Sequence, residues 1–384
     1  MNKRRKGLPL VLQLPITSRC NSRCKTCNVW KSGKNNDIDF VLLKAVFQDP
    51  FFSEVRTVGL NGGEFTLVPS FLSIMDSVLS LPKLSRVYLI SNGLFPKRLF
   101  EYLRETKTKC EEKKVWLNIC ISIDGVGSVH EKVRGIPNCF KKSKEILDEL
   151  YQNKKCYCDS FSVGCTLSRY NIGFVREIES FFSQYDGLNV EYHLAVPNKR
   201  IGTFDDYEDY YVLNGEESRL LATEFFYERF RIAEDEHFKR QSFVNFYFLK
   251  HNGHGRLCGC DYLDRDVTID ENFDMSLCAT ASDIIGNLRE QGASEIIKST
   301  KRKKIQQSLK KQCDTCVHYS YHSLNLKGRL AYIDALMHEK YVLEYYDACS
   351  HKQWKHRLRH CYSLSKRFLY EYLRLLYKYL WKLQ

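Results

Sequence analysis

The sequence predicts an α/β protein built on a parallel sheet. Three observations lead to this: short β-rich segments alternate with segments of helical periodicity, the chain has 384 residues, and 43% of them are hydrophobic. Such alternation is typical of parallel strands joined by crossover helices, and the length suits one large domain plus a smaller one. Right-handed crossovers curl a sheet of this kind into a full or partial barrel.

Six strands and five helices make up the expected barrel. Each strand is a short β-rich run, and each helix has apolar residues at helical spacing, with Asp37 as the expected cap of the first helix. The strands are expected at 10–17, 55–61, 86–91, 115–123, 159–167 and 188–195. The helices are expected near 38–48, 70–80, 97–109, 139–151 and 172–184.

Three cysteines follow the first expected strand. Cys20, Cys24 and Cys27 are one ligand short of a four-coordinate structural zinc site, and the next cysteine is Cys110. A four-iron cluster suits three thiolates better, because it leaves one iron open to a ligand that is not protein. The chain has 16 cysteines, and in a protein of this size they favour metal ligation over disulfides.

Three further motifs end the next three expected strands. They are NGGEF at Asn61 to Phe65, SNG at Ser91 to Gly93 and SIDG at Ser122 to Gly125. Reactive groups of such barrels gather at the carboxyl ends of the strands, so these motifs and the cysteine loop are expected on one rim. Each motif alone is weak, since Gly-Gly and Asn-Gly pairs are usually turns. Paired glycines do let a backbone approach a ligand closely.

Taken together, the cysteine spacing, the Gly-Gly-Glu and the strand order resemble the radical S-adenosylmethionine (SAM) superfamily, over roughly residues 10 to 200. The resemblance implies a partial, TIM-like (β/α)6 barrel whose cysteine loop holds a [4Fe-4S] cluster, with SAM on the open iron. Thr26 departs from the pattern, because many members have an aromatic residue before the third cysteine. This departure weakens an expected adenine contact and leaves the cluster unaffected.

The resemblance also implies which residues bind the cofactor. The methionyl amino group is expected at Gly62, Gly63 and Glu64, and the ribose near Ser91 and Asn92. The SAM carboxylate is expected at Ser122 and Arg134, and Asp124 of the SIDG motif is counted among the cofactor-binding residues.

A second group of cysteines lies towards the C-terminal end. Seventeen residues separate Cys260 from Cys278, a hairpin is expected around residues 270–272, and Cys313 and Cys316 form a close pair. From these residues alone, zinc and iron–sulfur fit equally well. The arrangement resembles the SPASM or twitch auxiliary domain, in the shorter twitch form. This implies an auxiliary [4Fe-4S] cluster held by those four cysteines, with Cys258 as a spare thiol or a replacement for Cys260.

Four regions are therefore expected. They are a radical SAM partial barrel at 1–202, a helical bridge at 203–255, a twitch/SPASM-like domain at 256–320 and a basic helical region at 321–384. The stretch 351–384 carries nine Lys or Arg against one Glu, with apolar residues on one helical face. Such a helix docks on the barrel or lies on an anionic membrane. Because the sequence has no membrane-spanning run, a cytoplasmic protein is expected, with peripheral membrane contact as the alternative. The sequence offers no recognised nucleic-acid reading module.

The resemblance implies a radical SAM oxidoreductase. Such an enzyme cleaves SAM reductively to a 5′-deoxyadenosyl radical, takes hydrogen from a small polar metabolite or a peptide, and needs a reducing partner such as flavodoxin or ferredoxin. Because the barrel begins close to residue 1, a metabolite is favoured over a peptide. Two alternatives are a non-catalytic zinc scaffold with a basic partner-binding tail, and an epimerase with a cysteine hydrogen donor. The leftover barrel cysteines are Cys120, Cys139, Cys156, Cys158 and Cys165.

Overall fold

The computed structural model describes residues 7–31, 33, 35–318, 323–350 and 369–378. Most of the basic stretch at 351–384, with the expected apolar helical face, lies outside the described residues. The chain divides into two compact units, the first formed by residues 1–221 and 261–313 and the second by residues 222–260 and 314–384.

One nine-stranded sheet forms the centre of the first unit, with the strand order β6-β5-β4-β3-β2-β1-β7-β8-β9. The strands β1 to β6 are parallel and adjacent in sequence order, which confirms the expected partial barrel. Their bounds are Val11–Thr17 (β1), Thr57–Gly62 (β2), Arg86–Ser91 (β3), Trp116–Ser122 (β4), Ser160–Leu167 (β5) and Val190–Leu194 (β6). Leu12, Leu14 and Ile16, which lie on one face of β1, are fully buried.

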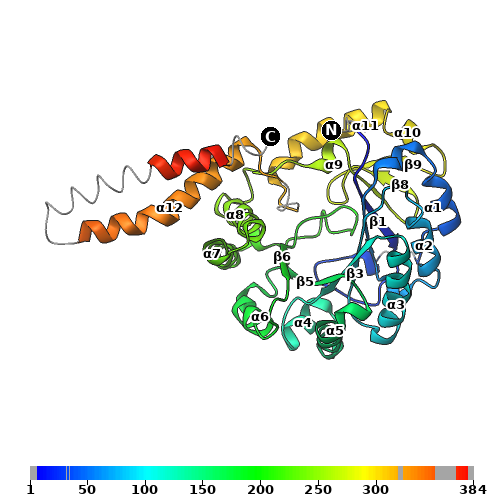
Figure 1. The fold of residues 1–384 in the computed structure, drawn as a ribbon, viewed down its shortest axis with the longest axis horizontal. Coiled ribbons are helices and arrows are strands. Elements are labelled where there is room, and N and C mark those ends of the chain that lie inside the picture. Colours follow the sequence, from blue (N-terminus) through cyan, green and yellow to red (C-terminus); the bar gives the residue numbers. More distant parts are fainter. Residues whose placement is uncertain (1–6, 32, 34, 319–322, 351–368, 379–384) are drawn as a thin grey trace. The chain divides into compact units, whose positions relative to one another are not determined.

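Crossover helices lie on the outside of these strands (Figure 1). They are α1 (Phe40–Val46), α2 (Phe71–Val78), α3 (Pro96–Glu112), α4 (Ser128–Arg134), α5 (Cys139–Asn153) and α6 (Val175–Phe182). The short helix α4 does not figure among the expected elements. The expected cap is wrong: the Asp39 carboxylate accepts the amides of Val41 and Leu42, whereas Asp37 accepts a 2.6 Å hydrogen bond from Thr17 Oγ1.

The expected hairpin extends the barrel sheet. Strand β7 (Val267–Ile269) pairs parallel with β1, and β8 (Asp274–Ser276) pairs antiparallel with β7. A third strand, β9 (Ile284–Asn287), pairs with β8 and was not expected. The Asp266 carboxylate fixes the junction, because it accepts the amides of Leu10 and Val11 at 2.9 and 3.1 Å. The helices α9 (Asp261–Asp264), α10 (Ala293–Ile296) and α11 (Thr300–Gln312) complete this unit.

Helices dominate the second unit. They are most of α7 (Glu216–Ile232), α8 (Glu236–Lys250) and α12 (Leu326–Ser350), and the first two fall in the expected helical bridge. Buried aromatic rings join them, since the ring centroid of Phe243 lies 5.4 Å from Phe230 and 5.1 Å from Tyr332. Among the described residues, no helix has the length and apolar character needed to cross a membrane.

Candidate active site

The cysteine loop follows β1 at the carboxyl edge of the sheet. Cys20, Cys24 and Cys27 are free thiols, each partly exposed. Burial raises the pKa of Cys20 to about 11 and that of Cys27 to about 12. Coordination to iron would reverse this preference for the thiol, because a coordinated thiol is deprotonated by the metal charge.

Polar groups point at two of the three sulfurs. Asn92 Nδ2 donates to Cys20 Sγ at 3.8 Å, and Arg134 Nη1 donates to Cys24 Sγ at 3.7 Å. Ser22 Oγ also lies 3.1 Å from Cys24 Sγ. Hydrogen-bond donors such as those of Asn92 and Arg134 are typical partners of the sulfurs that hold an iron–sulfur cluster. The residues present therefore fit the implied cluster.

These thiols do not form a site for a single ion. In the part of the chain that the structure describes, no three His, Cys, Asp or Glu side chains converge as ligands of one metal ion. A four-iron cluster does not require such convergence, because each thiolate binds a different iron.

Gly62, the last residue of β2, and Gly63 let this segment and the cysteine loop approach each other closely. Gly62 has a φ of +116°, and a Cβ there would lie 2.6 Å from Thr17 O. A Cβ on Gly63 would lie 1.9 Å from Arg19 O. The amides of Gly63 and Glu64 each donate a 2.7 Å hydrogen bond to the start of the cysteine loop. In this structure the close approach is therefore to the cysteine loop itself.

Glu64 joins the ends of β2 and β3. Its carboxylate accepts the amide of Asn92 at 2.7 Å and the hydroxyls of Ser91 and Thr66, both at 2.9 Å. Burial raises the pKa of Glu64, and these hydrogen bonds oppose the rise. The side chain of Asn92 also reaches the cysteine loop, since its Nδ2 donates to Asn21 Oδ1 at 2.8 Å. The predicted contacts of these residues with SAM stay predictions.

The SIDG motif brings the remaining predicted residues to the same rim. Ser122 ends β4 opposite Gly164 of β5. Asp124 Oδ2 lies 2.8 Å from Arg134 Nε in a buried ion pair. Burial opposes the charge of Arg134, but Asp124 and Cys24 outweigh it and raise the pKa of the guanidinium, which stays protonated.

Helix α4 holds the cysteine loop from the other side. The carbonyls of Val133 and Arg134 accept the amides of Lys25 and Arg23, at 2.8 and 2.9 Å. Gly135 ends the helix with a φ of +66°. A glycine directly after basic residues is a helix stop signal, so the sequence Lys-Val-Arg-Gly could have predicted this helix.

A second buried ion pair was also missed. Arg200, just after β6, lies 3.2 Å from Glu271 in the turn between β7 and β8. Their side chains are only 15% and 9% exposed. Burial lowers the pKa of Arg200, and the Glu271 carboxylate opposes this. The pair ties the hairpin turn to the barrel rim, which sequence patterns cannot show because 71 positions separate the two residues.

Two curated proteins are similar in sequence to part of this chain. No protein-family model matches it. A GTP 3′,8-cyclase of Haemophilus influenzae is 25% identical over 45% of this chain and 56% of its own length. The sporulation killing factor maturation protein SkfB of Bacillus subtilis is 28% identical over 37% of this chain and 33% of its own length. The chain thus matches about half of the first relative and a third of the second.

Solved structures share the fold over a greater length. The enzyme anSMEcpe, with bound AdoMet and a Cp18Cys peptide, covers 96% of this chain and 99% of its own, with a TM-score of 0.56 at 15% identity. Streptococcus suis SuiB bound to its precursor peptide SuiA covers 77% of this chain, with a TM-score of 0.53 at 12% identity. Together, these matches support the resemblance of this chain to the radical SAM superfamily. The rim described above is where the sequence predicted the cofactor site, and that assignment stays a prediction.

The predicted auxiliary ligands are divided between the two units. Cys278 and Cys313 belong to the first unit, and Cys260 and Cys316 belong to the second. In the first unit, Thr280 Oγ1 donates to Cys278 Sγ at 3.7 Å. The four-ligand set therefore stays a prediction.

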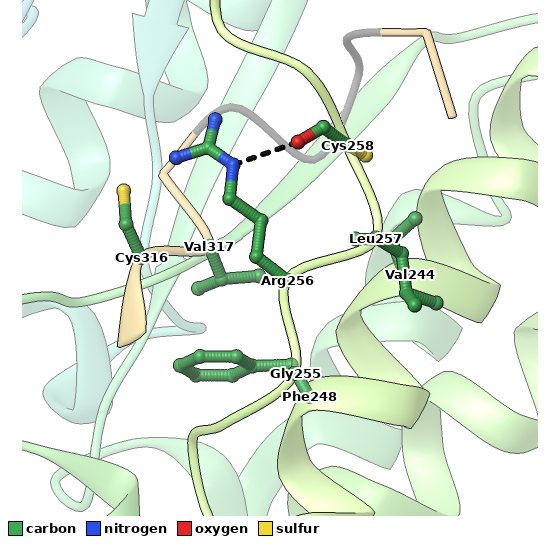
Figure 2. A pocket seen from close by; sticks show the side chains of 8 residues that line it. All are labelled: Val244, Phe248, Gly255, Arg256, Leu257, Cys258, Cys316 and Val317. Carbon is green, nitrogen blue, oxygen red and sulfur yellow. Dashed lines mark hydrogen bonds between the residues drawn. The ribbon is translucent and has the colours of Figure 1, made fainter. Parts of the chain in front are cut away.

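Cys258 lies beside a small cavity of the second unit (Figure 2). The cavity has a volume of about 10 Å³, room for one water molecule, and Cys316 also lines it. Arg256 Nε donates to the carbonyl of Cys258 at 2.8 Å. Burial raises the pKa of Cys258 to about 11. The shared cavity keeps Cys258 a candidate to replace Cys260.

Proposed function

We propose that this protein is a radical SAM enzyme that modifies a side chain of a peptide or protein. One observation carries the proposal: the cysteine loop, the Gly-Gly-Glu segment, Ser91-Asn92 and Arg134 are joined by hydrogen bonds at one rim. The fold match with anSMEcpe and SuiB, two proteins solved with peptides, supports a peptide over the small metabolite expected from the sequence.

In this proposal the chain binds and orients the reacting groups. Cys20, Cys24 and Cys27 would hold the [4Fe-4S] cluster, and the segments of Gly62 to Glu64 and Ser91-Asn92 would hold SAM. When bound, these groups supply a 5′-deoxyadenosyl radical that takes a hydrogen atom from the substrate. Arg134, kept protonated by its neighbours, can receive a carboxylate through its remaining donors.

The proposal includes an auxiliary [4Fe-4S] cluster on Cys260, Cys278, Cys313 and Cys316. Four protein ligands would leave it no open iron, so its role would be to accept an electron from the substrate radical, giving a net oxidation. A flavodoxin or ferredoxin would supply the electron that starts the reaction.

The first experiment tests cofactor chemistry. Protein reconstituted anaerobically should bind about eight irons per chain, four for each cluster, and should form 5′-deoxyadenosine from SAM after reduction. Replacing Cys20, Cys24 and Cys27 by Ala should remove half of the iron and all of the product. Cys156→Ala, at an exposed position, is the matched control and should change neither. Zinc in place of iron, or no SAM cleavage, would reject the proposal in favour of a scaffold.

The second experiment tests the substrate class. Cysteine-containing peptides and GTP are incubated separately with protein, SAM and reductant, and 5′-deoxyadenosine is measured. We expect peptides to stimulate its formation, with loss of two hydrogen atoms from the peptide by mass spectrometry. Stimulation by GTP alone would contradict the peptide proposal. Solvent deuterium in a peptide of unchanged composition would indicate epimerisation.

The third experiment assigns the first auxiliary ligand. Cys260→Ala should lower the iron content by about four atoms per chain, while Cys258→Ala should leave it unchanged. The reverse result would make Cys258 the ligand.

A further inference from the structure

Arg134 lies between a carboxylate and a cysteine sulfur. Its Nε is 2.8 Å from Asp124 Oδ2, and its Nη1 donates to Cys24 Sγ at 3.7 Å. The side chains of Arg134 and Asp124 are 12% and 3% exposed. Water therefore screens these charges weakly, and each acts strongly on its neighbours.

Further hydrogen bonds fix the positions of Asp124 and of the Arg134 backbone beside the cysteine loop. Asp124 Oδ1 accepts the amide of Thr166 at 2.8 Å, and the amide of Asp124 donates to His130 Nδ1 at 3.1 Å. The carbonyl of Arg134 accepts the amide of Arg23 at 2.9 Å and the hydroxyl of Ser22 at 3.1 Å. The guanidinium is thus held at a set distance from Cys24 by the fold itself.

We propose that Arg134 tunes the reduction potential of the cluster on the cysteine loop, and that Asp124 limits this effect. The inference rests on the proposed function, since it needs a cluster on Cys24. Reduction adds one electron to the cluster, and a positive charge beside a ligand sulfur stabilises the reduced form. Arg134 therefore raises the potential, and the negative charge of Asp124 lowers it by partly cancelling the guanidinium.

This role is separate from binding the SAM carboxylate. A guanidinium has five N–H donors, and the contacts with Asp124 and Cys24 leave others free for a carboxylate. Tuning of the potential acts whether or not SAM is present. A measurement without SAM therefore isolates it.

The test is a redox titration followed by electron paramagnetic resonance, on anaerobically reconstituted full-length protein without SAM. The relevant signal is the one missing from the variant in which Cys20, Cys24 and Cys27 are Ala. We expect Arg134→Gln to shift its midpoint potential to a more negative value and Asp124→Asn to shift it to a more positive one. Arg134→Lys, which keeps the charge, should give a smaller shift than Arg134→Gln. Lys132→Gln, which removes an exposed charge from the same helix, should leave it unchanged.

Opposite shifts in the two variants would separate tuning from a merely structural role, which has no reason to depend on the sign of the charge removed. The inference is overturned if both variants bind iron normally and keep the wild-type potential, or shift it in the same direction. If Arg134→Gln binds no cluster, an unchanged potential in Asp124→Asn also overturns it. Failure of the wild-type protein to bind a cluster would instead reject the proposed function.

Discussion

The carboxylate of Glu64 accepts a 2.7 Å hydrogen bond from the backbone amide of Asn92, so the loop after β2 holds the end of β3 directly. Glu64 is 1% exposed, and its other oxygen accepts the hydroxyls of Ser91 and Thr66. This carboxylate therefore positions Asn92, whose amide group reaches Cys20 and Asn21 of the cysteine loop. Two motifs that the sequence suggested as separate cofactor contacts form one buried network.

Replacing Glu64 by Gln should weaken this network. Gln keeps the size but turns one acceptor oxygen into a donor, which leaves buried donors without partners. Since each hydrogen bond to a charged group contributes on the order of 1.5–3 kcal/mol, we expect the free energy of unfolding to fall by about 2 kcal/mol. Urea unfolding measures it. Glu101→Gln, exposed on α3, is the control. Equal stability of the two variants would contradict this role for Glu64.

Gly63→Ala should displace the cysteine loop. The added Cβ would lie 1.9 Å from Arg19 O, a backbone atom that cannot rotate away. We expect a loss of about 3 kcal/mol of unfolding free energy and a lower iron content after reconstitution. Gly173→Ala is the control, because a Cβ there meets nothing within 4 Å. Normal iron binding by Gly63→Ala would show that the close approach is dispensable.

The sequence predicted the barrel and the rim because both depend on local pattern. Periodicity places each strand, and the motifs at Cys20, Gly62, Ser91 and Ser122 follow strands by a general rule of parallel sheets. It did not predict what these motifs contact. The Asn92 amide that Glu64 accepts is 28 positions away, and the Cys24 sulfur to which Arg134 donates is 110 positions away. Such pairings are set by tertiary packing and leave no periodic signal.

The sequence also did not predict that β7 pairs with β1, because this pairing too is set by tertiary packing. The alternation around residues 267–276 predicts a hairpin correctly, but an edge strand of a hairpin and a strand that extends a barrel sheet have the same local pattern. The anchor is Asp266, a charged residue 1% exposed whose partners are the amides of Leu10 and Val11. A single buried carboxylate of this kind cannot be recognised from sequence alone.

The buried ion pair of Arg200 and Glu271 should contribute more to the free energy of unfolding than the exposed ion pair of Lys199 and Asp283. Glu271→Gln would leave a guanidinium that is 15% exposed without its carboxylate, which costs on the order of 3 kcal/mol for a buried pair. The adjacent pair of Lys199 and Asp283, at 2.7 Å, has side chains 35% and 70% exposed. Asp283→Asn should therefore cost less than about 1 kcal/mol. Urea unfolding of the two variants compares them, and similar losses would contradict the burial argument.

His130 should make stability depend on pH. The ring is fully buried, with Nδ1 accepting the amide of Asp124 at 3.1 Å and Nε2 lying 3.3 Å from Ser143 Oγ. Burial, with a smaller effect of the Arg134 charge, lowers the pKa of His130 from 6.5 to about 3. The unfolded chain therefore binds a proton between these values while the folded chain does not. The contribution is fully present above pH 6.5 and is lost as the pH falls towards 3.

Urea unfolding at pH 7.0 and 5.5 checks this for the wild type and for His130→Asn, which keeps an acceptor for the Asp124 amide. A single site of this kind changes the free energy of unfolding by up to about 1.4 kcal/mol per pH unit. We expect the wild type to lose about 1 kcal/mol more than the variant over this interval. His251→Asn, which removes an imidazole at an exposed position, is the control variant. Equal losses in the wild type and His130→Asn would mean that His130 takes up its proton in the folded protein as readily as in the unfolded chain, which would contradict the lowered pKa.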